Sequence, residues 1–155
     1  MTGSVLLRDV TEDDLPVFFT HQQDPDACRM AAFPSRDKEA FMAHWARILA
    51  DASVLKRAIL LDGQLVGNIG SYLLEGKREV GYWIGKEHWG KGIATRALSA
   101  FLLLEPVRPL FAHAAKRNPA YKRVLEKCGF ETIGEDSWTP TGGSEVVEEY
   151  VLVLR

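Results

Sequence analysis

The chain has 155 residues, of which 46% are hydrophobic and 26% are charged, and its formal net charge is −2. These values are typical of one globular domain over residues 1–155, and they exclude a disordered chain, a collagen and a coiled coil. The near-neutral charge argues against a general nucleic-acid-binding protein. Cys28 and Cys128 lie far apart in the sequence, so neither a zinc ribbon nor a disulfide framework is expected.

Apolar segments of the kind that direct a chain to a membrane are not expected. The first residues contain no apolar signal-peptide region, and no apolar run approaches the roughly 20 residues that cross a bilayer. Together with the two unpaired cysteines, this predicts a cytoplasmic protein that makes no contact with membranes.

The first third of the chain predicts one strand and two helices. The strand covers residues 5–7. A helix follows Thr11, which forms a capping-box pattern with Asp14. A second helix is expected to begin after Ser35, because apolar residues then recur at helical spacing. Residues 24–34 between the two helices are predicted to form a loop that shapes a pocket.

The rest of the chain alternates strands and helices. Residues 58–61 and 65–73 predict a hairpin, because the pair Asp62-Gly63 tolerates the positive φ angles of a type I′ turn. Strands are expected over 80–84, 110–114, 130–133 and 146–154, with helices over 93–104 and from Asn118 to Gly129. This order predicts an α/β protein with a mixed sheet that helices cover.

The segment most informative about chemistry is residues 79–95, EVGYWIGKEHWGKGIAT. It runs from a strand through a Gly-rich loop into a helix. Gly90 and Gly92 let backbone N–H groups converge, and the helix dipole adds positive potential, so the loop favours a phosphate or pyrophosphate. The alternative is a plain turn. The patterns GxxxxGK[ST] and GxGxxG both fail here.

A basic segment follows this loop in the sequence. Residues 108–127 hold six basic residues and one acidic residue, Glu126. This excess favours an anionic ligand beside the helix that Asn118 caps. The alternative is a solvated helix face.

Several motifs resemble the GNAT superfamily of N-acetyltransferases. Residues 81–84 (GYWI) and 89–95 (WGKGIAT) are similar to its acyl-CoA signature, and 118–120 with 124–130 are similar to its next motif. Residues 7–14 and 32–34 resemble the Rim-type branch, which acetylates protein N-termini and small amines. The resemblance implies the GNAT fold, in which helices flank a mostly antiparallel central sheet that is splayed at the cofactor site.

The same resemblance implies acetyl-CoA as the cosubstrate and a set of residues that bind it. Backbone N–H groups near Trp83 and Ile84 are expected to stabilise the thioester oxygen. The full set comprises the strand end, the Gly-rich loop and the starts of two helices: Trp83, Ile84, Trp89, Gly90, Lys91, Gly92, Ile93, Ala94, Thr95, Asn118 and Arg123.

The catalytic residues depart from the family pattern. Leu125 stands where many members carry a catalytic Tyr, and Tyr121 stands where Rim-type members often carry Ser. We expect Tyr121 to protonate the leaving thiolate, with core packing as the alternative. Glu79 is the expected general base, with a solvent-facing charge as the alternative. Glu148 and Glu149 compete for that role.

The remaining polar residues have simpler expectations. We expect His113 to be a packed histidine within a strand, and His21 and His44 to lie on helix surfaces. His88 could titrate near neutral pH. Residues 131–149 hold six acidic and no basic residues, which forms either a rim that attracts a cationic amine or a hydrated strand edge.

These expectations combine into an enzyme that transfers an acetyl group from acetyl-CoA to a primary amine by direct attack on the thioester. The acceptor is a protein N-terminus or a small molecule, no metal is implied, and a homodimer is one option for assembly. One alternative is a non-catalytic CoA-binding or regulatory module. Another is an acyltransferase for a longer acyl chain.

Overall fold

A seven-stranded sheet forms the centre of the computed structural model, which describes residues 3–31, 36–139 and 145–155. The strand order is β1-β2-β3-β4-β5-β7-β6, and every neighbouring pair is antiparallel except β4 and β5. The strands are β1 (Val5–Arg8), β2 (Leu55–Leu61), β3 (Gln64–Leu74), β4 (Lys77–Ile84), β5 (Leu110–Ala115), β6 (Glu131–Trp138) and β7 (Val147–Leu154). The predicted α/β class with a mostly antiparallel sheet is confirmed.

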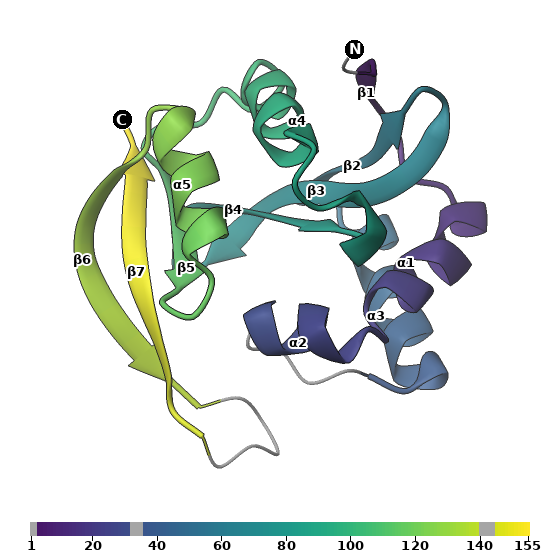
Figure 1. Cartoon of the computed structure of the whole chain (residues 1–155), viewed down its shortest axis with the longest axis horizontal. Coiled ribbons are helices and arrows are strands. Elements are labelled where there is room, and N and C mark those ends of the chain that lie inside the picture. Colours follow the sequence, from purple (N-terminus) through teal and green to yellow (C-terminus); the bar gives the residue numbers. More distant parts are fainter. Residues whose placement is uncertain (1–2, 32–35, 140–144) are drawn as a thin grey trace.

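Helices cover both faces of this sheet (Figure 1). The first group is α1 (Leu15–His21), α2 (Pro25–Ala31) and α3 (Lys38–Ala50); the second is α4 (Ile93–Leu102) and α5 (Pro119–Lys127). Two 3-10 turns, η1 (Glu12–Asp14) and η2 (Lys86–His88), complete the described elements. No helix among the described residues is long and apolar enough to cross a membrane.

The two faces of the sheet have separate hydrophobic clusters. Ala58 packs with Phe18, Phe41 and Trp45 of α1 and α3. Ile59, its neighbour on β2, belongs instead to the larger cluster that includes the buried side chains of α4 and Leu125 of α5. Successive side chains of a strand point to opposite faces, so Ala58 and Ile59 face different groups of helices.

The sheet is splayed between its two parallel strands. β4 and β5 pair at one position only, Glu79 with Phe111, whereas β3 pairs with β4 over eight positions from Gly67 to Leu74. Beyond Glu79 the two strands separate, and β5, β6 and β7 turn away from β4 (Figure 1). The polar backbone edge of β4 therefore faces a gap rather than another strand.

One predicted loop is a helix. Residues 24–34 include α2, because the Asp24 Oδ1 atom accepts hydrogen bonds from the backbone N–H groups of Asp26 and Ala27, at 2.9 and 3.0 Å. Pro25 begins the helix, where its missing N–H is no disadvantage. The remaining residues, 32–34, lie outside the described part of the chain.

Other predicted boundaries also change. The cap of α3 is Asp37, whose side chain accepts from Ala40 N at 2.7 Å, while the predicted cap, Ser35, lies outside the described residues. The helix predicted to reach residue 104 ends at Leu102. Strand β6 continues to Trp138 because it pairs with β7 throughout, although its polar sequence predicts only a short strand. The predicted turn at Asp62 and Gly63 is confirmed, since both residues have positive φ.

A buried ion pair joins the sheet to the segment after α4. Glu105 is 3% exposed and accepts hydrogen bonds from Arg78 Nε at 2.7 Å, from the Ser71 hydroxyl and from Val107 N. Burial alone would raise the pKa of Glu105, but these donors outweigh it and hold the pKa below its ordinary value.

We predict that Glu105→Ala lowers the free energy of unfolding by about 3 kcal/mol, because it leaves the Arg78 guanidinium, whose side chain is 12% exposed, without its carboxylate partner. Urea unfolding followed by circular dichroism measures the change. The matched control is Glu131→Ala, which breaks the exposed pair with Arg155 and should cost less than about 1 kcal/mol. Equal losses in the two variants would contradict a structural role for the buried pair.

Candidate active site

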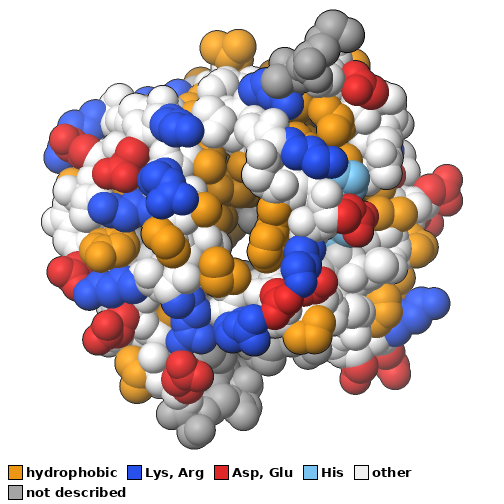
Figure 2. All heavy atoms as spheres, viewed as in Figure 1, with side chains coloured by type: hydrophobic (Ala, Val, Ile, Leu, Met, Phe, Trp, Pro, Cys, Tyr) orange, Lys and Arg blue, Asp and Glu red, His pale blue; other side chains and the backbone are white. Residues whose placement is uncertain are grey.

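The gap between β4 and β5 opens into a cavity of about 1150 Å³. Figure 2 shows this face of the molecule hollowed near its middle, with hydrophobic side chains lining the hollow and Lys and Arg side chains gathered over the region of α5. The walls come from β4, the Gly-rich loop, the starts of α4 and α5, and strands β5, β6 and β7. The cavity therefore lies where the sheet itself is interrupted.

Alternation along β4 assigns its side chains to the two sides of this cavity. Val80 and Ile84 are buried against α4, and Tyr82 packs on α5. Glu79 and Trp83 therefore point to the opposite face, which α1, α2 and α3 cover. Residues from both faces line the cavity, so it connects the α4/α5 side with the side of α1–α3.

The Gly-rich loop forms one end of the cavity. Gly90 and Gly92 have φ angles of 78° and 74°, in the left-handed region that favours glycine, and nothing lies within 4 Å of a Cβ built at either position. Gly92 caps α4, whose first N–H groups have no intrahelical partner. The Trp89 indole N–H donates to Ile84 O at 2.9 Å, which ties the loop to the end of β4.

The structure brings together nearly all of the predicted cofactor-binding residues. Those that line the cavity are Trp83, Ile84, Trp89, Gly90, Gly92, Ile93, Ala94, Thr95, Asn118 and Arg123. Lys91 is the exception, because its side chain is exposed and lies outside the lining, whereas Lys127 of α5 takes part in it. Asn118 also caps α5, accepting from Tyr121 N at 3.3 Å.

The backbone N–H group at the centre of the gap belongs to Tyr82. It donates to the Tyr121 hydroxyl at 3.2 Å, so it points away from β3. Because N–H directions alternate along an antiparallel strand, the N–H of Ile84 also faces the gap, whereas that of Trp83 faces β3. Of the N–H groups near Trp83 and Ile84, those of Tyr82 and Ile84 are therefore the ones on the side of the gap.

Tyr121 occupies the wall of the gap with its hydroxyl group pointing at β4. Its ring stacks on Tyr82, with centroids 4.4 Å apart and planes 4° from parallel. Burial raises the pKa of the Tyr121 hydroxyl above its ordinary value, against a smaller opposing effect of the bond from Tyr82 N. The hydroxyl is thus protonated at neutral pH, and its oxygen accepts one bond while its proton stays available.

Glu79 and His113 form a pair at the other end of the cavity. The Glu79 Oε2 atom lies 2.9 Å from His113 Nδ1, and Glu79 is only 3% exposed. The interpretation of Glu79 as a solvent-facing charge is therefore wrong. His113 is half-buried and lines the cavity, so it is not simply packed in the core. The bond to Glu79 raises the pKa of His113, and Glu149 and Asp136 raise it further.

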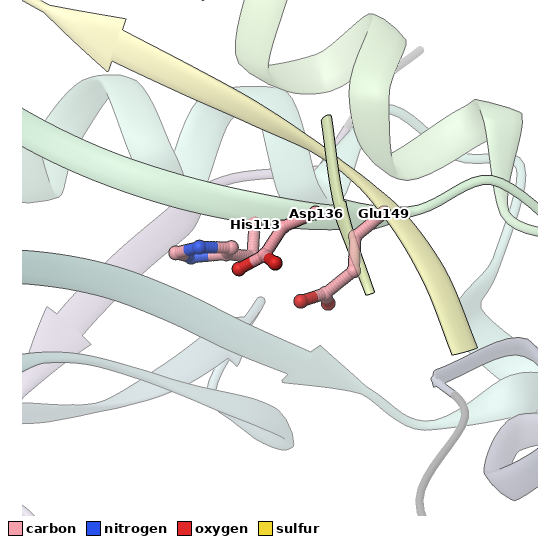
Figure 3. A group of neighbouring side chains, drawn as sticks. All are labelled: His113, Asp136 and Glu149. Carbon is pink, nitrogen blue, oxygen red and sulfur yellow. The ribbon is translucent and has the colours of Figure 1, made fainter. Parts of the chain in front are cut away.

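Two more carboxyl groups lie beside His113 (Figure 3). Asp136 of β6 and Glu149 of β7 are paired across the two strands, and polar atoms of both lie within 4.8 Å of each other and of the imidazole. Burial raises the pKa of Glu149. Glu148 is exposed, its Oε2 atom lies 3.9 Å from Lys116 Nζ, and it is outside the cavity lining. Of the two candidate bases Glu148 and Glu149, only Glu149 therefore reaches the cavity.

Sequence reasoning missed several residues of this end. Asp136, Trp138 and Tyr72 line the cavity together with His113, but no spacing links them, because they come from three different strands, β3, β5 and β6. His21, predicted on a helix surface, is buried where its ring meets Gly85. The acidic composition of residues 131–149 was a signal for this end of the cavity. It predicted an acidic rim but did not show that Asp136 and Glu149 are the acidic residues beside His113.

We predict that the His113 pKa, measured by NMR titration, lies above 6.5 and that Glu79→Gln lowers it. A raised folded-state pKa contributes stability that is fully present below pH 6.5 and is lost as pH rises through the folded-state pKa. Glu79→Gln should therefore also reduce this loss of stability, because Glu79 is the largest of the groups that raise the His113 pKa. His44, whose pKa burial lowers, is the internal control and should not respond. An unchanged His113 titration in the variant would refute the pairing.

Comparisons with known proteins agree with this geometry. The Acetyltransferase (GNAT) domain family matches residues 4–131. A curated relative from Bacillus subtilis (strain 168), named "Putative ribosomal N-acetyltransferase YdaF", is 38% identical over 106 residues, which are 63% of this chain and 57% of the relative. The match thus spans little more than half of that protein. Its name is of the kind that the Rim-type resemblance implies.

Two solved structures share the fold. An acetyltransferase (GNAT family) from Bacillus anthracis superposes with a TM-score of 0.82 at 19% identity, covering 99% of this chain and 96% of the other. RimL, a ribosomal L7/L12 alpha-N-protein acetyltransferase solved with coenzyme A, gives a TM-score of 0.77 at 18% identity over 97% and 94% of the two chains. At these identities the structures establish the fold alone. The sequence match over most of the chain and the splayed sheet together show that this protein belongs to the GNAT acetyltransferase family.

Proposed function

We propose that the protein is an N-acetyltransferase that transfers the acetyl group of acetyl-CoA to a primary amine. The observation that carries this function is one cavity with the Gly-rich loop at one end and, at the other, the buried Glu79 carboxylate paired with the half-buried His113 imidazole. The amine attacks the thioester carbonyl directly, the C–S bond breaks, and the thiolate leaves. The name of the Bacillus subtilis relative refers to ribosomal N-acetylation, so a ribosomal protein is one candidate acceptor.

The Gly-rich loop is the part of the cavity that suits the cofactor's pyrophosphate. The N–H groups at the start of α4 are donors without helical partners, and the side-chain space beside Gly90 and Gly92 is open. Arg123 and Lys127 on α5 add positive charge to the same side. The coenzyme A in the RimL structure supports this type of ligand.

Proton removal from the amine falls to the Glu79–His113 pair. An alkylamine has a pKa of about 10 and is protonated at neutral pH, so it must lose a proton before it attacks. His113 is the more accessible member, with a side chain 25% exposed against 4% for Glu79. Its imidazole takes the amine proton, and the carboxylate behind it orients the ring and stabilises the imidazolium that forms.

Tyr121 suits the opposite step, in which the thiolate leaves. Its hydroxyl is protonated, lies at the gap and is held by the N–H of Tyr82. A thiol has a pKa of only about 8.5, so its thiolate can also leave unassisted. The contribution of Tyr121 should therefore be smaller than that of the Glu79–His113 pair.

The first test concerns the loop. We predict that Gly92→Val abolishes binding of coenzyme A measured by calorimetry, because the branched side chain fills the space proposed for the pyrophosphate. Gly63→Val is the matched control: its φ of 83° imposes the same backbone strain in the β2–β3 turn, away from the cavity. Equal affinities of the two variants would remove the loop from the site.

The second test measures rates as release of free thiol. We predict that Glu79→Gln lowers kcat by about 100-fold and moves the acidic limb of the pH–rate profile to lower pH, because His113 then loses the partner that raises its pKa. Tyr121→Phe should lower kcat about tenfold with little change in the KM for acetyl-CoA. The control, Glu148→Gln, should behave as the unmodified protein.

Two outcomes decide against these roles. Full kcat in Tyr121→Phe would leave that residue as packing alone. An unmoved acidic limb in Glu79→Gln would exclude the pair as the base. A lack of thiol release with every amine and N-terminal peptide would instead favour a non-catalytic CoA-binding module.

A further inference from the structure

The Gly-rich loop has no side-chain packing at its two glycines to hold its shape. Gly90 and Gly92 have left-handed backbone angles, and no described atom outside the adjacent residues lies within 4 Å of a Cβ built at either position. Glycine is also the residue with the greatest conformational freedom. A loop of this composition keeps one conformation only if other groups hold its backbone.

The side chain of Arg96, the fourth residue of α4, holds the end of this loop. Its Nη2 atom donates to Lys91 O at 3.3 Å, and its Nε atom donates to Gly92 O at 3.4 Å. Its Nη1 atom donates to Gly3 O, two residues before the edge strand β1, beside which α4 packs. One guanidinium group therefore joins the last two carbonyl groups of the loop to backbone at the edge of the sheet.

The positions of these two carbonyl groups set the directions of the next two N–H groups. In a planar trans peptide unit the C=O and N–H bonds point in opposite directions. The Lys91 and Gly92 carbonyl groups point toward Arg96, so the N–H groups of Gly92 and Ile93 point away from it. Gly92 and Ile93 line the cavity, whereas Arg96 is outside its lining. The arrangement thus leaves two backbone donors on the cavity side.

The charge of Arg96 is unusual for its position in the helix. A cation near a helix N-terminus opposes the macrodipole, and acidic side chains are the ones favoured there. Residues 93–96 form the first turn of α4 and include no acidic residue, so Arg96 is the one charged residue among them. An anion bound at the loop offsets the repulsion between this cation and the helix dipole. The pyrophosphate proposed for the loop carries such a charge.

We propose that Arg96 is a positioning residue for the cofactor, which fixes the loop so that the N–H groups of Gly92 and Ile93 are aimed at the pyrophosphate of coenzyme A. This rests on the proposed cofactor site and deepens it. The guanidinium group acts through the loop, because it binds the carbonyl groups on the side away from the cavity. A lysine cannot replace it, since an ammonium group lacks the planar fork of donors that reaches several carbonyl groups at once.

The test measures coenzyme A affinity by calorimetry in Arg96→Met, Arg96→Lys and a matched control, Arg155→Met. Arg155 is exposed and pairs with Glu131, so the control removes the same charge away from the cavity. We expect at least about tenfold weaker binding in Arg96→Met and at least about fivefold weaker binding in Arg96→Lys, because the loop donors lose their orientation. Arg155→Met should bind as the unmodified protein does. Circular dichroism shows that each variant is folded at the temperature of the titration.

A spectroscopic readout separates positioning from a general loss of structure. On adding coenzyme A, the amide proton resonances of Gly92 and Ile93 should move downfield, because both groups then donate to phosphate oxygens. Pantetheine, which lacks the pyrophosphate, should leave them in place. In Arg96→Met at saturating coenzyme A both shifts should be smaller, whereas the shift of the Asn118 amide, on another wall of the cavity, should match that of the unmodified protein.

The outcomes separate this inference from the function on which it rests. Failure of the unmodified protein to bind coenzyme A refutes the cofactor site and with it the role of Arg96. Normal affinity in Arg96→Met leaves the cofactor site standing and refutes the positioning role. Full affinity in Arg96→Lys also refutes it, because charge alone would then account for the effect. An equal loss of affinity in Arg155→Met refutes it as well, since the effect would then belong to the net charge of the protein.

Discussion

The feature on which the rest of the molecule depends is the single paired position between β4 and β5. Parallel strands need a regular ladder to satisfy both edges, and here that ladder stops at Glu79 and Phe111. The backbone edge of β4 beyond this point keeps its donors and acceptors available. The Tyr121 hydroxyl meets Tyr82 N, and the Trp89 indole meets Ile84 O. Side chains thus complete the edge without closing the gap.

The same interruption gives the cavity two chemically different ends. Alternation along β4 sends Val80, Tyr82 and Ile84 to the α4/α5 side, where the Gly-rich loop and basic residues lie. Glu79 lies at the apex of the gap and points to the other side, where it is buried against His113. The proposed cofactor and the proposed amine acceptor can therefore enter the cavity from opposite faces of one sheet.

Much of this architecture could be predicted from local patterns. The Asp62-Gly63 turn, the cap at Asn118 and the glycines of the loop each depend on one or two residues and their own backbone angles. The cavity lining contains ten of the eleven predicted cofactor-binding residues, because they are nearly continuous in the sequence. The sequence analysis missed helix α2, although Asp24 and Pro25 form a recognisable cap. It also predicted too short a strand for β6, because the polar residues of β6 form a strand only through pairing with β7.

The sequence by itself thus determined the class of fold, the Gly-rich loop and Glu79 as a residue of the cavity, since each follows from short-range pattern. Tertiary structure alone decided that His113 faces Glu79, that Glu149 rather than Glu148 reaches the cavity, and that Asp136 lies beside both. The physical reason is strand register. A shift of one residue between β5, β7 and β6 would turn each of these side chains to the opposite face, and register is fixed by pairing and packing across the whole sheet.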